Sequence, residues 1–339
     1  MIIEELSHKV DDISKDNTIL YFITRVLKPE VKASSRLMNK YLFKAYQIDV
    51  NDEIREHLYT LTKEQLNGLV KRKTELHEYD VITDDTAQLF TYQMTNKAMS
   101  FYDVVNNQLV SNPPKIKSLE EIIIDEDLWA YCVGFYNDED EWIYTFRKIL
   151  AAKVAIDENN SNKKSKLQKT LRTIFNSQSQ KLELIEGETV NLDKQIDCIY
   201  YVDTFYIVKK TQFEQIIGLE EEYKHLANEV VVELASTKMI EGLEIIEKQI
   251  NENPSIHKKL VRLTKLGNYK DLNLEIINKM QEICKKYGET LKLKDGKIFI
   301  EDENDITLTL KVLADYYKLG EVSGKAYGTY AGKQLQTTQ

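Results

Sequence analysis

The sequence predicts an α+β fold, with a mixed N-terminal domain and a helix-rich C-terminal domain that carries short antiparallel strands. Three observations support this prediction. The first half of the chain contains short runs of β-branched and aromatic residues, which are typical of strands. The second half contains amphipathic segments that begin with helix-start signals. Between the two halves, residues 157–166 are polar and lack apolar side chains.

The polar segment sets the expected domain boundary. Residues 157–166 predict a mobile linker or loop, because such a composition buries too little apolar surface to form a core. We therefore expect an N-terminal α+β domain over residues 1–156 and a C-terminal domain over residues 167–339. A chain of 339 residues is long enough for two domains.

The N-terminal domain is expected to contain four strands. They lie at residues 18–24, 43–50, 128–136 and 142–147. The last two flank a short acidic turn, so we expect them to form a β-hairpin. Helical spacing is found over residues 52–73 and 95–109. Because Thr62 and Gln65 fit a capping box, the first of these segments can be one helix or two.

In the C-terminal domain, strand and turn signals alternate with helical ones. The apolar run 196–208 is expected to split at Asp203-Thr204 into two paired strands. Thr211 and Glu214 fit a capping box that begins a helix. Asp295-Gly296 is typical of a type I′ turn, so the surrounding residues predict a hairpin. The other expected elements are a strand at residues 181–186 and helices over residues 211–234, 237–251, 272–287 and 305–318.

Composition excludes several classes of protein. The formal net charge of −9 argues against a uniformly basic nucleic-acid-binding surface. Cys132, Cys198 and Cys284 are far apart and odd in number, which argues against a disulfide framework or a zinc site. The N-terminus carries acids where a secretory signal needs positive charge, and no apolar run approaches the roughly 18 residues of a membrane span. We expect a cytoplasmic protein that reaches a membrane only through a partner.

Charge is unevenly distributed along the C-terminal half. Residues 212–252 contain ten acids and three lysines, whereas residues 257–297 contain eleven Lys or Arg residues and five acids. Opposite potentials on neighbouring segments allow an acidic protein to present a local cationic surface to an anionic partner. This distribution is the reason to look for a nucleic-acid site in the second segment.

The candidate nucleic-acid-binding residues lie on a predicted helix at steps of three and four. They are Lys258, Lys259, Arg262 and Lys265, and these steps place them on one broad side of that helix. Leu260, Val261 and Leu263 are expected to pack inward. Two interpretations fit this pattern: a face that follows a phosphate backbone, or an ordinary amphipathic helix with its lysines toward solvent.

The C-terminal tail adds three further candidates, Lys325, Tyr327 and Lys333. A tyrosine beside lysines suits base stacking combined with phosphate contacts. The same pattern suits a closing strand, and both interpretations stand. We expect no catalytic residue, no metal ligand and no cofactor, since the five histidines are scattered and no glycine-rich phosphate loop follows a strand.

The enzymatic alternative is a metal-dependent nuclease. Asp203 followed by Glu222 and Lys224 supplies the residue types of an Asp…Glu-x-Lys metal site. However, Glu222 and Lys224 are two positions apart in a predicted helix, so their side chains diverge. A protein-binding scaffold without nucleic-acid contacts is the third alternative.

A family resemblance rests on the order of short motifs in the C-terminal half. The motifs are Tyr206-Ile-Val-Lys-Lys, Phe213-Glu214, Lys258-Lys259-Leu260, Asp315-Tyr316 and Ser323-Gly324-Lys325-Ala326-Tyr327 with the later Lys333. In this order the chain resembles the KwaB-like family, the cytosolic component of the bacterial Kiwa antiphage defence system. The resemblance covers about residues 181–335. It implies a homo-oligomeric, dimeric protein that binds phage DNA and acts with a small multi-pass membrane partner.

The function expected from these observations is an antiphage defence protein without chemistry of its own. It is expected to bind DNA through the basic C-terminal face and to respond to the membrane partner.

Overall fold

The structure is a computed structural model that describes most of the chain. The described residues are 2–28, 41–72, 75–81, 88–95, 97, 99–116, 126–137, 141–149, 173–176, 181–184, 192, 195–253, 255–266 and 269–329, with the side chains of residues 2, 173–176, 181–184 and 221 left out. The described residues form two compact units. The first holds those up to Ile216 apart from a short segment after His77, and the second holds that segment and the residues from Ile217 onward.

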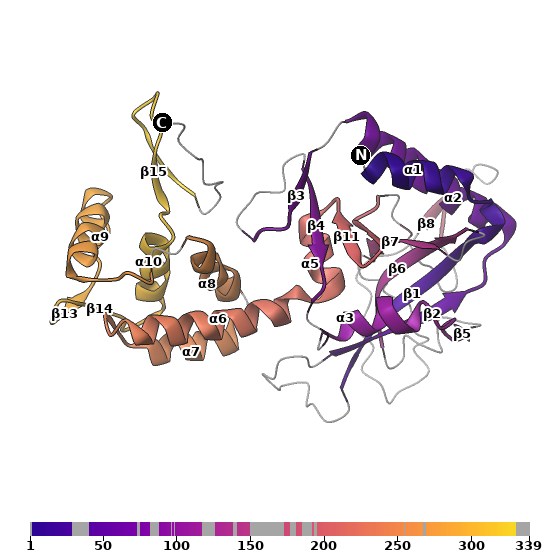
Figure 1. Ribbon diagram of the computed structural model, residues 1–339. Helices are drawn as coiled ribbons and strands as arrows, with labels where there is room; N and C mark the ends of the chain where they lie inside the picture. The colour runs from indigo at the N-terminus through magenta and orange to yellow at the C-terminus, as the bar shows by residue number, and fades with distance from the viewer. Residues whose placement is uncertain are drawn as a thin grey trace. The chain divides into compact units, whose positions relative to one another are not determined.

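The first unit is built around a nine-stranded sheet with the order β3-β4-β11-β10-β7-β6-β1-β2-β5 (Figure 1). Its strands are β1 Thr18–Leu27, β2 Tyr41–Ile48, β3 Leu76–Glu78, β4 Leu89–Gln93, β5 Lys115–Ile116, β6 Asp127–Tyr136, β7 Trp142–Lys148, β10 Cys198–Tyr201 and β11 Thr204–Ile207. The four strands expected in the N-terminal half all form, and β6 pairs with β7 in the predicted antiparallel hairpin. A separate pair joins β8 (Thr173–Asn176) and β9 (Lys181–Leu184).

The apolar run 196–208 splits into β10 and β11, as its composition predicted, but the turn lies one residue earlier. Val202 and Asp203 occupy the turn with φ of 43° and 55°. Two successive residues with positive φ give the twist that a tight antiparallel hairpin needs. The pair then extends the central sheet, because β10 lies beside β7 and β11 lies beside β4.

Helices α1 (Ile2–Asp12) and α2 (Asp52–Lys71) pack together beside one face of the sheet (Figure 1). Their apolar side chains share a core with those of the strands, including Leu6, Leu66 and Phe135. The possible break at Thr62 is absent, and α2 is continuous over 20 residues. The Thr62 hydroxyl instead donates to the Leu58 carbonyl and accepts from the buried guanidinium of Arg147.

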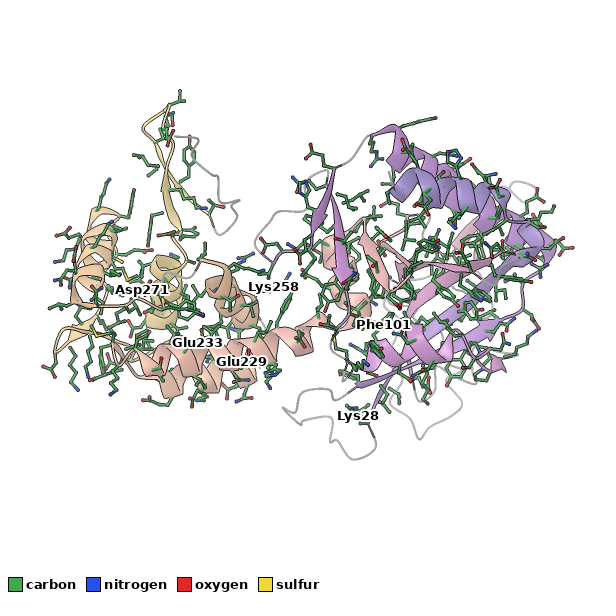
Figure 2. All side chains as sticks on the ribbon, in the orientation of Figure 1. Lys28, Phe101, Glu229, Glu233, Lys258 and Asp271 are labelled. Atoms are coloured by element: carbon green, nitrogen blue, oxygen red, sulfur yellow. The ribbon has the colours of Figure 1, made fainter. Side chains whose placement is uncertain are left out.

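The segment 95–109 forms less regular helix than its spacing predicted. It contains α3 (Ser100–Asp103) and a π-helical turn, η2 (Val104–Gln108). Phe101, labelled in Figure 2, is fully buried and lies at 5.4–6.4 Å from the rings of Phe43, Phe146 and Phe205. The Met and aromatic side chains of this segment therefore belong to the core.

The second unit is helical with two small sheets. Its helices are α6 Leu219–Ser236, α7 Leu243–Glu252, α8 Ser255–Leu266, α9 Leu274–Lys286 and α10 Glu303–Leu313. A three-stranded sheet joins β12 (Ile240–Glu241), β14 (Lys297–Phe299) and β13 (Leu293–Lys294), and a hairpin joins β15 (Tyr317–Leu319) and β16 (Ala326–Gly328). The predicted turn at Asp295-Gly296 is confirmed, with φ of 51° and 77°.

The helix expected over residues 211–234 is two helices. Helix α5 (Lys210–Ile217) begins one residue before Thr211, so Thr211 lies inside the helix and the predicted capping box is wrong. Gly218, with φ of 75°, separates α5 from α6. The left-handed conformation of this glycine breaks the helical path.

The architecture is a mixed α+β fold with a helix-rich C-terminal part, as the sequence predicted. The expected linker 157–166 lies outside the described residues, so the boundary drawn there stays a prediction. In the part of the chain that the structure describes, no helix has both the length and the hydropathy to cross a membrane.

Candidate nucleic-acid interface

Helix α8 is held in place by an apolar side that the sequence predicted. Leu260, Val261 and Leu263 are all buried, and Leu260 and Leu263 join the core of the second unit. At the start of the helix, Oδ1 of Asn253 accepts a hydrogen bond of 3.1 Å from the amide of Ser255. This bond satisfies one of the donors that a helix N-terminus leaves without an intrahelical partner. The packing fixes which side of α8 faces outward.

The outward side carries the four predicted cations, which we call the α8 face: Lys258, Lys259, Arg262 and Lys265. Lys265 is exposed, and the other three are half-buried. At about 1.5 Å of rise per residue, the four charges extend over roughly 10 Å along one helix. Among the residues that the structure describes, no carboxylate forms an ion pair with Lys259 or Lys265. These two charges are therefore available to an external anion.

Lys258 lies against an aromatic side chain of α6. Its Nζ is 5.7 Å from the centroid of the Tyr223 ring, and the Tyr223 hydroxyl contacts the hydroxyl of Tyr79 (Lys258 is labelled in Figure 2). A cation over a ring face gains modest electrostatic stabilisation, and the contact also restricts the lysine. The sequence did not identify Tyr223 or Tyr79 as part of this site. No local signal could have done so, since 35 and 179 positions separate these tyrosines from Lys258.

His257 lies beside this face but points inward. The ring is 3% exposed, and its Nε2 lies 2.7 Å from the Ile250 carbonyl. A carbonyl can only accept, so Nε2 carries the hydrogen. Nδ1 is buried without a hydrogen-bond partner. Burial lowers the pKa of His257, with Lys224 acting in the same direction and Glu220 opposing. The ring is therefore neutral near pH 7 and supports α7–α8 packing without contributing positive charge.

The other cations of the basic segment are largely balanced by carboxylates. Lys270 pairs with Glu233 at 3.5 Å, and Lys297 pairs with Glu241 at 3.4 Å. Lys292 lies within 4.0 Å of the carboxylates of Glu301, Asp302 and Asp305. Among the described residues, the cations of this segment without a carboxylate partner are thus Lys259 and Lys265 of the α8 face and a few exposed lysines of α9.

The predicted tail residues lie in a different element. Lys325 and Tyr327 are exposed on the β15–β16 hairpin, and Tyr327 forms part of strand β16. The ring of Tyr327 also covers Gly320, where an added Cβ would lie 3.0 Å from Tyr327 Cε2. The tail thus pairs as a strand, and its exposed lysine and ring remain accessible. Lys333 lies outside the described residues.

The residues of the nuclease alternative have separate structural roles. Asp203 lies in the β10–β11 turn of the first unit, where it accepts a 3.2 Å hydrogen bond from the Tyr200 hydroxyl. Glu222 and Lys224 lie on α6 in the second unit. Within the described residues, no group of three or more His, Cys, Asp or Glu side chains is arranged to hold a metal ion.

Comparison with known proteins gives one match. The family model described as Kiwa protein KwaB-like matches residues 125–322, which include α8 and all of the second unit's helices. Neither the curated proteins nor the solved structures contain a match to the chain.

Proposed function

Because the chain belongs to the Kiwa KwaB-like family, a component of an antiphage defence system, we propose that it binds phage DNA through the α8 face. Lys258, Lys259, Arg262 and Lys265 contact backbone phosphates, and Lys325, Tyr327 and Lys333 of the tail add secondary contacts. The protein performs no chemistry on the DNA. The observation that carries the proposal is the gathering of four cations on one side of α8 in a chain of net charge −9.

Flexible lysines and one arginine along a helix suit contacts with phosphates better than base recognition. Phosphate contacts fix position but carry no sequence information. Binding is therefore independent of sequence and weakens as salt concentration rises, because each neutralised phosphate releases counterions. Contacts to about three or four phosphates give a slope of log K against log salt of roughly −3, from about −0.9 per phosphate.

The test compares two double variants with the same change in net charge. Lys259→Glu with Lys265→Glu reverses two cations of the α8 face, whereas Lys279→Glu with Lys285→Glu reverses two exposed lysines of α9. Affinity for a duplex is measured by fluorescence anisotropy at two salt concentrations. We expect the α8 variant to lose at least about tenfold in affinity and to show a shallower salt slope. Equal losses in both variants would mean that net charge, rather than the α8 face, decides binding.

The same titration, repeated with magnesium, tests the nuclease alternative. Intact DNA with unchanged affinity supports the non-catalytic proposal. Cleavage that disappears in Asp203→Ala would replace that proposal with a metal-dependent nuclease.

We further propose that the protein is a homodimer and acts with a membrane protein of the same defence system. The acidic residues of α6 and α7 give it surfaces for basic cytosolic loops of that partner, whereas the acidic residues 138–140 lie outside the described residues. Light scattering after size-exclusion chromatography measures the oligomeric state. Co-purification that survives neutralisation of Glu244 and Glu247 on α7 would remove that helix from the interface.

A further inference from the structure

Trp129 occupies an irregular position in the central sheet. Strand β6 pairs with β1, but Ile23 lies opposite Ala130 and Thr24 lies opposite Leu128. Trp129 is therefore the extra residue of a β-bulge. A bulge leaves one residue out of the regular pairing and redirects its side chain, and bulges are retained for that purpose.

Two cations lie against the indole of Trp129. Nζ of Lys148 is 3.5 Å from the ring centroid, and Cζ of Arg25 is 3.6 Å from it. A cation over the face of an indole is attracted by the ring quadrupole, so both side chains hold the ring. Arg25 is also held by Asp127 at 3.0 Å and by the ring of Tyr41 at 4.3 Å. The indole is thus held by two cations, one of which is itself anchored.

Lys148 is anchored to the same residue through the main chain. Its ammonium donates to the carbonyls of Trp129 and Ile149 at 2.7 and 3.1 Å. Burial, together with the nearby charge of Arg25, lowers the pKa of Lys148 to about 8. A lysine this constrained acts as a fixed support for the ring.

The edge of the indole contacts the end of α5. Nε1 of Trp129 donates to the carbonyls of Gln215 and Ile216, at 2.9 and 3.3 Å. The last carbonyls of a helix have no intrahelical donor and need a partner elsewhere. Helix α5 ends at Ile217, Gly218 follows with φ of 75°, and α6 begins at Leu219. Gly218 therefore joins α5, whose residues up to Ile216 belong to the first unit, to α6 of the second unit.

We propose that Trp129 is a side-chain cap that fixes the C-terminal end of α5, next to the joint at Gly218. Arg25 and Lys148 hold the indole in the capping position. We call this group the Trp129 cap. The cap stops the last turn of α5 from fraying, so the backbone between α5 and α6 can change conformation only at Gly218. Loss of the cap releases the last turn of α5 and widens the joint to several residues. This inference is independent of DNA binding.

The test uses Trp129→Phe in the full-length chain, with Trp142→Phe as the matched control. Phenylalanine keeps an aromatic face for the two cations but removes the N–H donor. Trp142, the other tryptophan, stacks on Tyr144 at 5.4 Å and lies tilted against Tyr136 at 4.9 Å. Hydrogen exchange is followed by mass spectrometry in peptides that span residues 210–220.

In Trp129→Phe we expect exchange at the end of α5 to accelerate about fivefold to tenfold, while peptides of β1 and β7 keep their wild-type rates. Trp142→Phe should leave the α5 peptide unchanged. The inference is overturned if the α5 peptide exchanges at the wild-type rate in Trp129→Phe. It is also overturned if exchange accelerates evenly across the sheet, since that pattern reports general destabilisation.

A second variant keeps the inference testable if Trp129→Phe does not fold. Lys148→Met retains the indole donor and removes one of its two supports. A smaller acceleration, confined to the same α5 peptide, is expected. Wild-type exchange in that peptide would show that the cations do not hold the cap.

Discussion

Nζ of Lys292 lies 3.0 Å from Oδ2 of Asp305. Asp305 belongs to the capping box at the start of α10, where it also accepts the amides of Glu301 and Asp302 at 2.9 and 3.1 Å. Burial by itself favours the protonated form of Asp305, but these amides and the ammonium outweigh it and hold its pKa below the usual value. Lys292 therefore serves the fold of the second unit, although in the sequence it looks like part of a cationic surface.

Lys292 provides a prediction that separates stability from DNA binding. Lys292→Met should lower the melting temperature, because the carboxylates of Glu301 and Asp305 lose their shared cation. Affinity for DNA should stay within about twofold of wild type, since the charge of Lys292 is already balanced. Thermal unfolding and anisotropy measure the two effects. A loss of affinity comparable to that of the α8 variant would extend the binding surface to β13.

The buried ring of His257 predicts a dependence of stability on pH. Its pKa is lowered in the folded protein, so the unfolded chain takes up a proton near pH 6.5 while the folded one resists it. The free energy of unfolding should therefore fall as pH drops below 6.5, by up to about 1 kcal/mol per pH unit. Urea unfolding at pH 7.5 and 5.5 measures the change. His257→Gln should show a smaller difference between the two pH values, and an equal difference would assign the effect to other groups.

Lys148 predicts a dependence of the same sign at higher pH. Its pKa of about 8 is below the ordinary 10.5, so between these values the unfolded chain binds more protons than the folded one. The free energy of unfolding should rise from pH 8 to pH 9.5, by about 1 kcal/mol after allowance for screening by solvent. Lys148→Met should lack this rise. The difference between the two proteins is the quantity to compare, because buried tyrosines such as Tyr21 and Tyr144 already begin to ionise below pH 10 in the unfolded chain.

Two glycines predict effects of opposite sign for the same substitution. Gly242 precedes α7 with φ of 87°, and an added Cβ would lie 2.0 Å from the carbonyl oxygen of Ile300. Gly242→Ala should destabilise the second unit by roughly 2–4 kcal/mol. Gly68 lies in α2 with nothing within 4 Å of an added Cβ, so Gly68→Ala should stabilise the first unit by up to about 1 kcal/mol. Denaturant unfolding of both variants measures the contrast, and a neutral Gly242→Ala would contradict the tight contact.

Local sequence patterns predicted the fold best where interactions between residues close together in the chain determine it. The β6–β7 hairpin, the turn at Asp295-Gly296 and the apolar side of α8 are all found as expected. Each depends on residues close together in the chain. At Thr62 the sequence left one helix or two open, and a contact distant in the chain accompanies the single helix. The buried Thr62 hydroxyl accepts a hydrogen bond from Arg147, 85 positions away, and α2 continues through this residue without a break.

The α+β class, the family resemblance and the four cations on one side of α8 could all be predicted before the structure was known. These follow from hydrophobic period, motif order and helical spacing, which are properties of neighbouring residues. Tertiary packing between distant segments determines which charges stay available to a partner. It brings Glu233 to Lys270, Glu241 to Lys297 and Asp305 to Lys292. It also brings Trp129 to the end of α5. The ion pairs and the Trp129 contact both depend on side chains that meet only when distant segments pack together.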